Sequence, residues 1–397
     1  MRAVSAPPTP SVWTADDART VTRLMLLAVA WRVVTALFAY LANAQLPLAQ
    51  PEQFTVLNDT HVFWDTFARN DSGWYLGIAS RGYLWVDGGR NNLAFFPAYP
   101  LLMGLAGRMF GGGQADMFFG GIVVSWIASV AATGVVYATA RLDLPPTPAW
   151  HAAVLTLVFP FAFFFGVVYS ESLFLLGLSA AVFGLRTRRW WIGAAAGAVM
   201  TATRVNGVMA VPALVWLAWE AATPTRDGRR RAIAASLATS LGVTAYSFYN
   251  WRVAGDPFEW YHAITRWGYY PGATVAGNPL ATLVTNLVTR PYAYLITEPA
   301  APYDVLNGLF PVVMAVCLPW LWRRLGAGYA LLIAANLALP LSSGQFEGLG
   351  RYSAVLFPFQ IWVASAATPA ARVVIYGAYG VLYVVALALF TTLHPIF

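Results

Sequence analysis

The chain is dominated by apolar runs of about 20 residues, which is the length that crosses the hydrocarbon core of a membrane. Such runs cover residues 22–43, 117–140, 149–168, 171–186, 232–252, 305–322, 327–342, 352–367 and 373–393. Only 10% of the 397 residues are charged, whereas soluble proteins have roughly a quarter. Because only helices and closed barrels satisfy their backbone in lipid, runs of this length predict an all-α, polytopic transmembrane protein.

Two further stretches are ambiguous, and the distribution of arginines decides between their interpretations. The stretch 190–220 has Arg204 and Asn206 at its centre and arginine-rich flanks on both sides. Arginine-rich loops stay on the cytoplasmic side of a membrane, so both flanks should lie together. We therefore expect 190–220 to cross as two short helices, with the turn at 203–207 near the outer boundary in a protein-lined cavity.

The stretch 93–112 is interrupted by two prolines and an arginine, at positions 97, 100 and 108. A crossing here would place either the N-terminus or the arginine-rich loops on the wrong side, so we expect an interfacial or re-entrant helix. The resulting topology has about 11 spans, an inner N-terminus and an outer C-terminus. Two long outer loops follow from it, at 44–116 and 253–304, both rich in aromatic residues that suit the membrane surface.

The charges agree with this topology. Of the 17 acidic residues in the chain, the inner segments hold only Asp16, Asp17, Asp143, Glu220 and Asp227. The net charge of +7 does not indicate nucleic-acid binding, because the arginines are spread over short loops and form no single patch. We expect residues 1–20 to form a disordered cytoplasmic tail, and 21–397 to form one transmembrane domain that begins with a retained helix.

The composition excludes several kinds of site. The single cysteine, Cys317, rules out an intrachain disulfide and argues against a thiolate metal site. The chain has no glycine motif that would cradle a phosphate and no nucleophile elbow. Its histidines are scattered, at His61, His151, His262 and His394. We therefore expect no metal and no cofactor.

The first outer loop contains the segment HVFWDTFARNDSGWYLGIASRGY at residues 61–83. Asp71 precedes an amphipathic stretch that ends before Gly82, which predicts a short helix with a cap at each end. Two compatible interpretations follow for Asp71. Its carboxylate caps the helix by accepting backbone N–H bonds, or it is a rigidly held base that faces a cleft.

Ionisable residues in apolar segments are costly and are therefore functional candidates. Glu171 lies at the expected outer end of a span, and Arg204 lies at the turn of the short hairpin, where Glu171 is a candidate partner. The alternative for Glu171 is a place in the first turn of a helix. Arg351 either binds an anion or extends to the interface, and Arg32 either binds an anion or pairs with a neighbouring helix.

The second outer loop has a group of ionisable residues beside aromatic ones. Carboxylates next to aromatic rings suit sugar binding, and they equally suit a solvated interfacial helix. The group comprises Asp256, Glu259, His262 and Arg266, interleaved with Trp260, Tyr261 and Trp267. The aromatic and proline-rich stretch 91–100 in the first outer loop is best interpreted as an interfacial anchor.

Five motifs give the sequence a family resemblance. They are Asp71-Ser72-Gly73-Trp74-Tyr75-Leu76 with Ile78-Ala79 and Gly82-Tyr83, Ala94-Phe95-Phe96-Pro97-Ala98-Tyr99-Pro100-Leu101, Tyr169-Ser170-Glu171-Ser172-Leu173-Phe174, Ala202-Thr203-Arg204-Val205-Asn206-Gly207, and Arg351-Tyr352 with Phe357-Pro358. Over most of residues 60–360 they resemble the bacterial relatives of the second mannosyltransferase of GPI-anchor synthesis. These PIG-V-like proteins belong to the GT-C class of polytopic membrane glycosyltransferases.

One departure from the family concerns the key carboxylate. The family pattern usually has Trp directly before the Asp, whereas Asn70 precedes Asp71 here. A Trp-Asp pair does occur at Trp64-Asp65, so Asp65 is the runner-up. Asp71 is preferred because the spacing of the residues that follow it fits the family.

The resemblance implies inverting transfer of a sugar, expected to be mannose, from a polyprenyl-phosphate carrier to a hydroxyl of a lipid-linked or glycan acceptor. It places the protein in the bacterial cytoplasmic membrane with the active site facing outward. We expect Asp71 as base, Glu171 either orienting the acceptor or supporting Asp71, and Arg204 and Arg351 as ligands of the donor phosphate. The residues expected to bind sugar or acceptor are Trp74, Tyr75, Tyr169, Asn206, Asp256, Glu259 and His262.

The alternative function is a lipid or glycan transporter without catalysis. Transporters commonly contain internal repeats of their helix pattern, and the two halves of this chain differ in loop lengths and motifs. The candidate residues also cluster on one side of the expected topology. Both observations favour an enzyme whose partners are a lipid-linked donor, an acceptor and membrane lipid.

Overall fold

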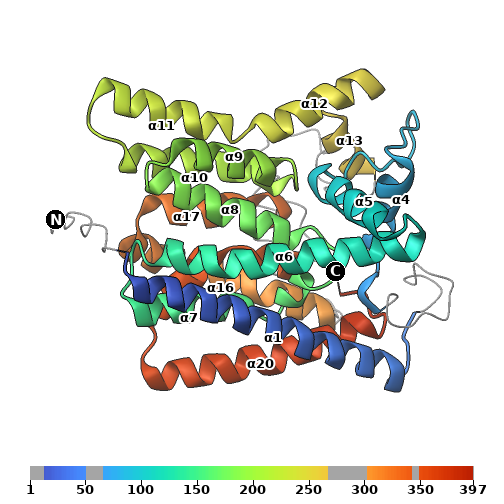
Figure 1. Ribbon diagram of the computed structural model, residues 1–397, viewed down its shortest axis with the longest axis horizontal. Coiled ribbons are helices and arrows are strands. Elements are labelled where there is room, and N and C mark those ends of the chain that lie inside the picture. Colours follow the sequence, from blue (N-terminus) through green and yellow to red (C-terminus); the bar gives the residue numbers. More distant parts are fainter. Residues whose placement is uncertain (1–12, 51–65, 267–301, 342–347, 397) are drawn as a thin grey trace, which may run out of the picture.

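The computed structural model describes residues 13–50, 66–266, 302–341 and 348–396, and this part of the chain is helical with no β-strand. Its longest helices run along the long axis of the molecule (Figure 1). They are α1 (Ala15–Gln45), α6 (Gln114–Ala140), α16 (Pro302–Leu325) and α20 (Pro369–Thr391). All four contain stretches long and apolar enough to cross a membrane. The protein is thus all-α and polytopic, and the number of 11 spans stays a prediction.

Ion pairs join several helix ends at the end of the bundle where α1 begins. Arg141, which follows α6, binds Asp17 of α1 with 2.7 Å between Nε and Oδ1. Arg186, the last residue of α8 (Glu171–Arg186), binds Asp143, which also accepts a hydrogen bond of 3.0 Å from Tyr329 of α17 (Ala327–Leu341). The opposite end carries α4 (Ser72–Arg81), α5 (Ala98–Phe110) and α13 (Glu259–Arg266) (Figure 1). The helices of both expected outer loops therefore share one end.

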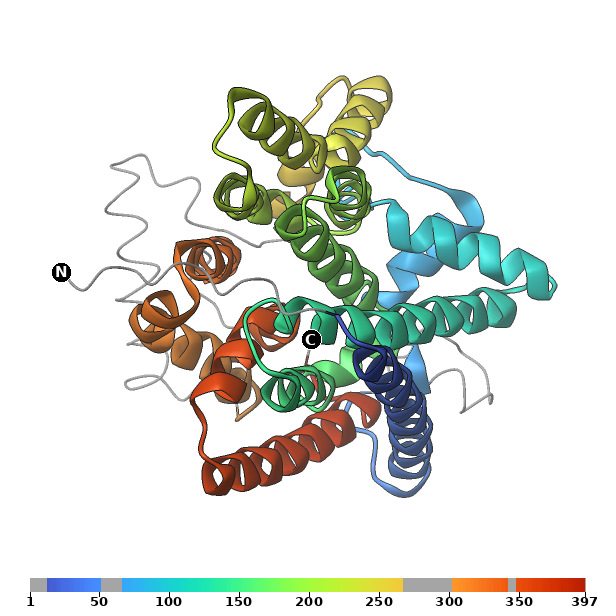
Figure 2. The ribbon, with the colours of Figure 1, turned by 60° about the vertical axis from the view of Figure 1, so that its left-hand side comes forward.

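The predicted hairpin at 190–220 is present. Its arms are α9 (Trp190–Thr201) and α10 (Asn206–Ala221), and a short turn at 202–205 joins them. Helix α8 approaches α9 so closely that a Cβ atom on Gly184 would lie 2.5 Å from the backbone nitrogen of Gly193. In Figure 2 these helices lie between α20 at one edge of the molecule and α11 (Arg226–Ala238) and α12 (Leu241–Ala254) at another.

The predicted helix at 149–168 is wrong in its second half. Helix α7 (Pro146–Leu157) stops early, and the chain to residue 170 is non-helical apart from the 3-10 turn η1 (Ala162–Phe165). Pro160 explains the stop, because proline lacks an N–H and its ring clashes with the carbonyl four residues earlier. The irregular segment is buried in protein, which is where such backbone is tolerated at membrane depth.

The predicted helix at 232–252 is broken between α11 and α12. At the break the Thr201 hydroxyl donates to the Thr239 carbonyl at 2.7 Å and accepts from the Val243 N–H at 3.3 Å. The side chain of another helix thus replaces the backbone bond from Val243 to Thr239, which is a recognised cause of helix kinks.

The predicted helix at 352–367 is also two helices, α18 (Leu349–Ala354) and α19 (Phe357–Ala366). Pro358 in the first turn of α19 has no N–H to bond a preceding turn, so the two helices meet at a bend. The expected tail of 1–20 is too long. Helix α1 begins at Ala15, where Thr14 and Asp17 form a capping box. Residues 1–12 lie outside the described part of the chain.

Helix α5 lies in the stretch 93–112 that we expected to be interfacial or re-entrant. It has 13 residues, or about 20 Å at 1.5 Å per residue, which is too short for a hydrocarbon core of about 30 Å. It packs against α6, where Gly107 and Gly120 bring the two backbones into contact. Of the expected outer loops, 51–65 and 267–301 lie outside the described residues.

We predict that Gly184→Ala lowers the free energy of unfolding by about 1–3 kcal/mol, because the new methyl group meets backbone of α9. The control is Gly380→Ala in α20, where a Cβ atom would have no neighbour within 4 Å; it should change stability by less than about 1 kcal/mol. Thermal unfolding of both variants in the same detergent measures the difference. Equal effects of the two substitutions would show that α8 and α9 are not in close contact.

Candidate active site

Glu171 is the centre of a buried group of charges. It is the first residue of α8, and its side chain is fully buried. Oε1 forms an ion pair with Arg204 and lies 3.8 Å from Nε of Arg351. Within the described chain, Oε2 is buried without a hydrogen-bond partner. One carboxylate therefore faces two arginines, which come from positions far apart in the sequence.

Asp71 joins this group through Arg351. Nη1 of Arg351 lies 2.5 Å from Oδ2 of Asp71. Asp71 occupies the N-cap position of α4, but its side chain makes no capping hydrogen bond. The capping interpretation is therefore wrong, because the carboxylate points to an arginine. The Asp71 side chain is 26% exposed, whereas that of Glu171 is fully buried, so Asp71 is the carboxylate that a substrate can reach.

The two arginines lie in a turn and in a short helix of six residues. Arg204 lies in the turn between α9 and α10. Arg351 lies in α18, which begins after Gly348 in the left-handed conformation, with a φ of 72°. The next glycine, Gly350, has the ring of Phe161 where a side chain would be. The non-helical segment before α8 thus packs directly against the helix that carries Arg351.

Aromatic rings surround the two guanidinium groups. The Arg204 guanidinium lies 4.8 Å from the centre of the Tyr352 ring, and that of Arg351 lies 5.5 Å from the Tyr169 ring. Such cation–π contacts favour a positive charge that has lost water. The Tyr75 hydroxyl lies 3.0 Å from Oγ of Ser170, which also accepts a hydrogen bond of 3.3 Å from Arg204. Tyr75, Tyr169 and Arg204 therefore belong to one network.

Two members of this network were not among the predicted site residues. Ser170 and Tyr352 are both in the quoted motifs, each next to a predicted residue, but neither carries a charge that would single it out. Among the predicted residues, Trp74 stacks on Phe95 with 5.9 Å between ring centres, and the Asn206 amide donates to the Asn336 carbonyl at 3.3 Å. The runner-up, Asp65, lies outside the described residues.

The residues predicted in the second outer loop form a separate group around α13. His262 Nδ1 lies 2.6 Å from Asp256 Oδ2. Glu259 is almost fully buried, forms an ion pair with Arg266 and accepts a hydrogen bond of 2.8 Å from Asn91. Burial opposes ionisation of Asp256, but hydrogen bonds from the Phe258 N–H and from His262 hold its pKa below the ordinary value. This group thus joins the two outer loops.

The same three side chains are the nearest approach to a metal site in the described part of the chain. The ligand atoms of Asp256, Glu259 and His262 lie within 4.8 Å of one another. However, Glu259 already has Arg266 and Asn91 as partners, and a cation would have to displace a permanently charged guanidinium. The geometry therefore gives no support for a metal ion here. Arg32 lies in neither group.

No protein-family model matches the chain. Over 218 residues it is 27% identical to GPI alpha-1,6-mannosyltransferase 2 of Cricetulus griseus. The matched region is 50% of this chain and 42% of that protein, so the chain matches less than half of its curated relative.

Solved structures of an Archaeoglobus fulgidus oligosaccharyltransferase are also similar to the chain. The apo form has a TM-score of 0.46 and 12% identity, over 93% of this chain and 56% of that one. The complex with an inhibitory peptide and a dolichol-phosphate has a TM-score of 0.45 and 12% identity, over 92% and 56%.

We predict that Glu171→Gln lowers the free energy of unfolding by about 3–5 kcal/mol, because removing one partner of a buried ion pair leaves the other charge uncompensated. The matched control is Glu220→Gln, where an exposed carboxylate bonds Trp216 near the end of α10; surface changes of this kind stay within about 0.5 kcal/mol. Chemical unfolding of both variants gives the comparison. A Glu171→Gln protein as stable as the control would mean that Glu171 is not ionised between the arginines.

Proposed function

We propose that the protein is a GT-C membrane glycosyltransferase. It moves a sugar, expected to be mannose, from a polyprenyl-phosphate carrier to a hydroxyl of a glycan or glycolipid acceptor at the extracytoplasmic face. The observation that carries the proposal is the meeting of Asp71, Glu171, Arg204 and Arg351 in one group. The similarity to a mannosyltransferase over half of the chain supports the same class of reaction.

The two arginines supply positive charge that stabilises the leaving phosphate. When the bond between the anomeric carbon and the phosphate oxygen breaks, the carrier phosphate gains one negative charge. A guanidinium group is permanently charged and matches phosphate oxygens in geometry. Arg204 and Arg351 are nearly buried, and charges in such a site stabilise a developing anion far more than charges in water do. Glu171 keeps both arginines in place before the donor binds.

Arg351 also connects donor binding to the base. Without substrate, its guanidinium occupies a lone pair of the Asp71 carboxylate. A donor phosphate that binds Arg351 takes over this contact and frees Asp71 to accept a proton. Asp71 then removes the proton of the acceptor hydroxyl while the hydroxyl oxygen attacks the anomeric carbon. A single displacement of this kind inverts the configuration of the sugar.

The different exposure of Asp71 and the arginines indicates where each substrate binds. The acceptor reaches the more exposed Asp71, while the carrier phosphate reaches the buried arginines from the side of the membrane. The group around Glu259 and His262, which links the two outer loops, is suited to hold the acceptor. Trp74, which is on the same helix as Tyr75 and stacks on Phe95, is the aromatic residue that we expect beside the sugar.

We predict that Asp71→Asn lowers kcat by about 100- to 10,000-fold, the range for loss of a general base, while the KM for the donor falls, because the donor phosphate no longer competes with the Asp71 carboxylate for Arg351. The assay uses purified protein in liposomes with a labelled polyprenyl-phosphate sugar and scores the labelled product. The control is Asp87→Asn, an exposed carboxylate in the same outer loop, which should keep wild-type turnover. Wild-type turnover of Asp71→Asn would remove Asp71 as the base.

The same assay separates the enzyme from the transporter. A transporter moves the labelled carrier lipid between leaflets and leaves the bond to the sugar intact. Transfer of label to a new acceptor therefore supports the proposal, and movement of intact carrier with no product contradicts it.

A further inference from the structure

Arg32 is a fully buried arginine in the middle of α1, with no carboxylate partner in the described part of the chain. Its guanidinium bonds two backbone carbonyls instead. Nη1 lies 3.0 Å from the Ala162 oxygen, and Nη2 lies 3.3 Å from the Leu157 oxygen. Both carbonyls belong to the stretch in which α7 ends and the non-helical segment begins. A permanently charged side chain is therefore directed at irregular backbone.

The position of these carbonyls explains why an arginine is suitable. Leu157 is the last residue of α7, where helix carbonyls lack partners and carry partial negative charge. Ala162 begins η1. Backbone groups at membrane depth must be satisfied within the protein, and the fork of a guanidinium reaches two carbonyls at once. Arg32 thus replaces bonds that the helix would have made without Pro160.

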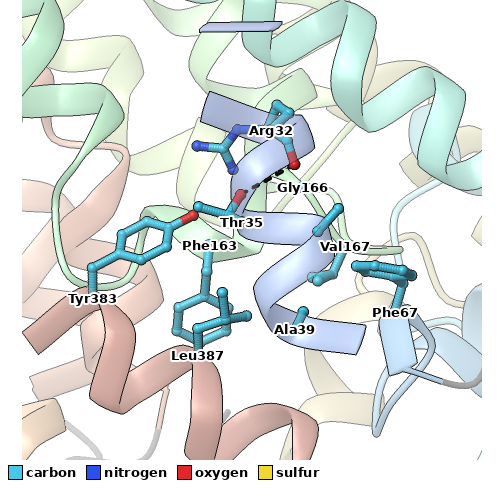
Figure 3. A pocket seen from close by; sticks show the side chains of 10 residues that line it. Arg32, Thr35, Ala39, Phe67, Phe163, Gly166, Val167, Tyr383 and Leu387 are labelled. Atoms are coloured by element: carbon cyan, nitrogen blue, oxygen red, sulfur yellow. Dashed lines mark hydrogen bonds between the residues drawn. The ribbon is translucent and has the colours of Figure 1, made fainter. Parts of the chain in front are cut away.

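The pocket beside Arg32 is too small to be a substrate site. Figure 3 shows Arg32, Thr35 and Tyr383 around it, with apolar side chains completing the wall. Its volume is about 10 Å³, which is the space of one water molecule and far less than a sugar phosphate needs. The contacts of Arg32 therefore serve to hold the chain.

The segment that Arg32 holds leads directly to the site. Gly166 passes so close that a Cβ atom there would lie 3.0 Å from Nη1 of Arg32. Two residues later, the Val168 carbonyl accepts a hydrogen bond of 3.0 Å from Ser72 of α4. Three residues beyond Val168 stands Glu171. The segment is thus fixed by Arg32 at one end and by the helix of Asp71 at the other.

We infer that Arg32 is a positioning residue, which fixes the segment 158–170 so that Glu171 meets Arg204 and Arg351. The role in catalysis rests on the proposed function, but the mechanical role does not. The other attachment of the segment is the hydrogen bond from Ser72 of α4 to Val168, which does not involve Arg32. Loss of the Arg32 contacts should therefore loosen the chain between Leu157 and Val168. Glu171 would then bind the arginines in several arrangements, and the donor would bind less tightly.

The test compares Arg32→Gln with Arg32→Lys and with Arg141→Gln, which removes another nearly buried arginine, paired with Asp17 near the start of α1. Hydrogen exchange of the backbone amides of 158–170 should become at least tenfold faster in Arg32→Gln and stay unchanged in Arg141→Gln. The KM for the donor should rise at least tenfold in Arg32→Gln with the KM for the acceptor unchanged. Arg32→Lys, which keeps the charge but loses the fork, should fall in between.

Unchanged exchange in 158–170, or an equal increase in Arg141→Gln, would overturn the inference. If Arg32→Gln does not fold, Gly166→Ala takes its place, because its methyl group would lie 3.0 Å from Nη1 of Arg32 and push the guanidinium away from its carbonyl partners by a few tenths of an ångström; it should speed exchange in the same segment, and wild-type exchange would again overturn the inference. Faster exchange together with no product from the wild-type protein would leave the positioning role standing and reject the proposed function.

Discussion

One buried carboxylate facing two arginines is the interaction on which the site depends. Glu171 begins α8, Arg204 lies in the α9–α10 turn, and Arg351 lies in α18. Burial of any one of these charges alone would cost several kcal/mol, so the protein interior tolerates the three charges because they meet. With Asp71, the group has two positive and two negative charges. It is therefore neutral until a phosphate enters and competes for the arginines.

The non-helical parts of the fold carry residues of this charged group to one another. Helix α7 stops at Leu157, and the non-helical chain that follows delivers Tyr169, Ser170 and Glu171 to the arginines. The α9–α10 turn places Arg204 beside Glu171. Each interruption leaves backbone groups that other residues must satisfy, as Thr201 does at the break between α11 and α12. Arg32 has the same supporting task where α7 ends.

The sequence predicts features that local residues determine. Arginines on both flanks predicted the α9–α10 hairpin, and Gly82 predicted the end of α4. The sequence does not predict features that distant residues determine. The end of α7 was missed because the apolar run continues past Pro160, and the α11–α12 break depends on Thr201, 38 residues before Thr239. The contact between Asp71 and Arg351 joins residues 280 positions apart, so only the motifs suggested that both belong to one site.

The central claim is that the two arginines form a phosphate site, and its most direct test is equilibrium binding of sugar-free polyprenyl phosphate. The wild-type protein should bind it at least tenfold more tightly than the matching polyprenol, a difference of about 1.4 kcal/mol. Arg351→Gln should lose this preference, and Arg324→Gln, which removes an exposed arginine bonded to Ser365, should keep it. Equal affinity for phosphate and alcohol, or an Arg351→Gln protein that still prefers the phosphate, would contradict the account.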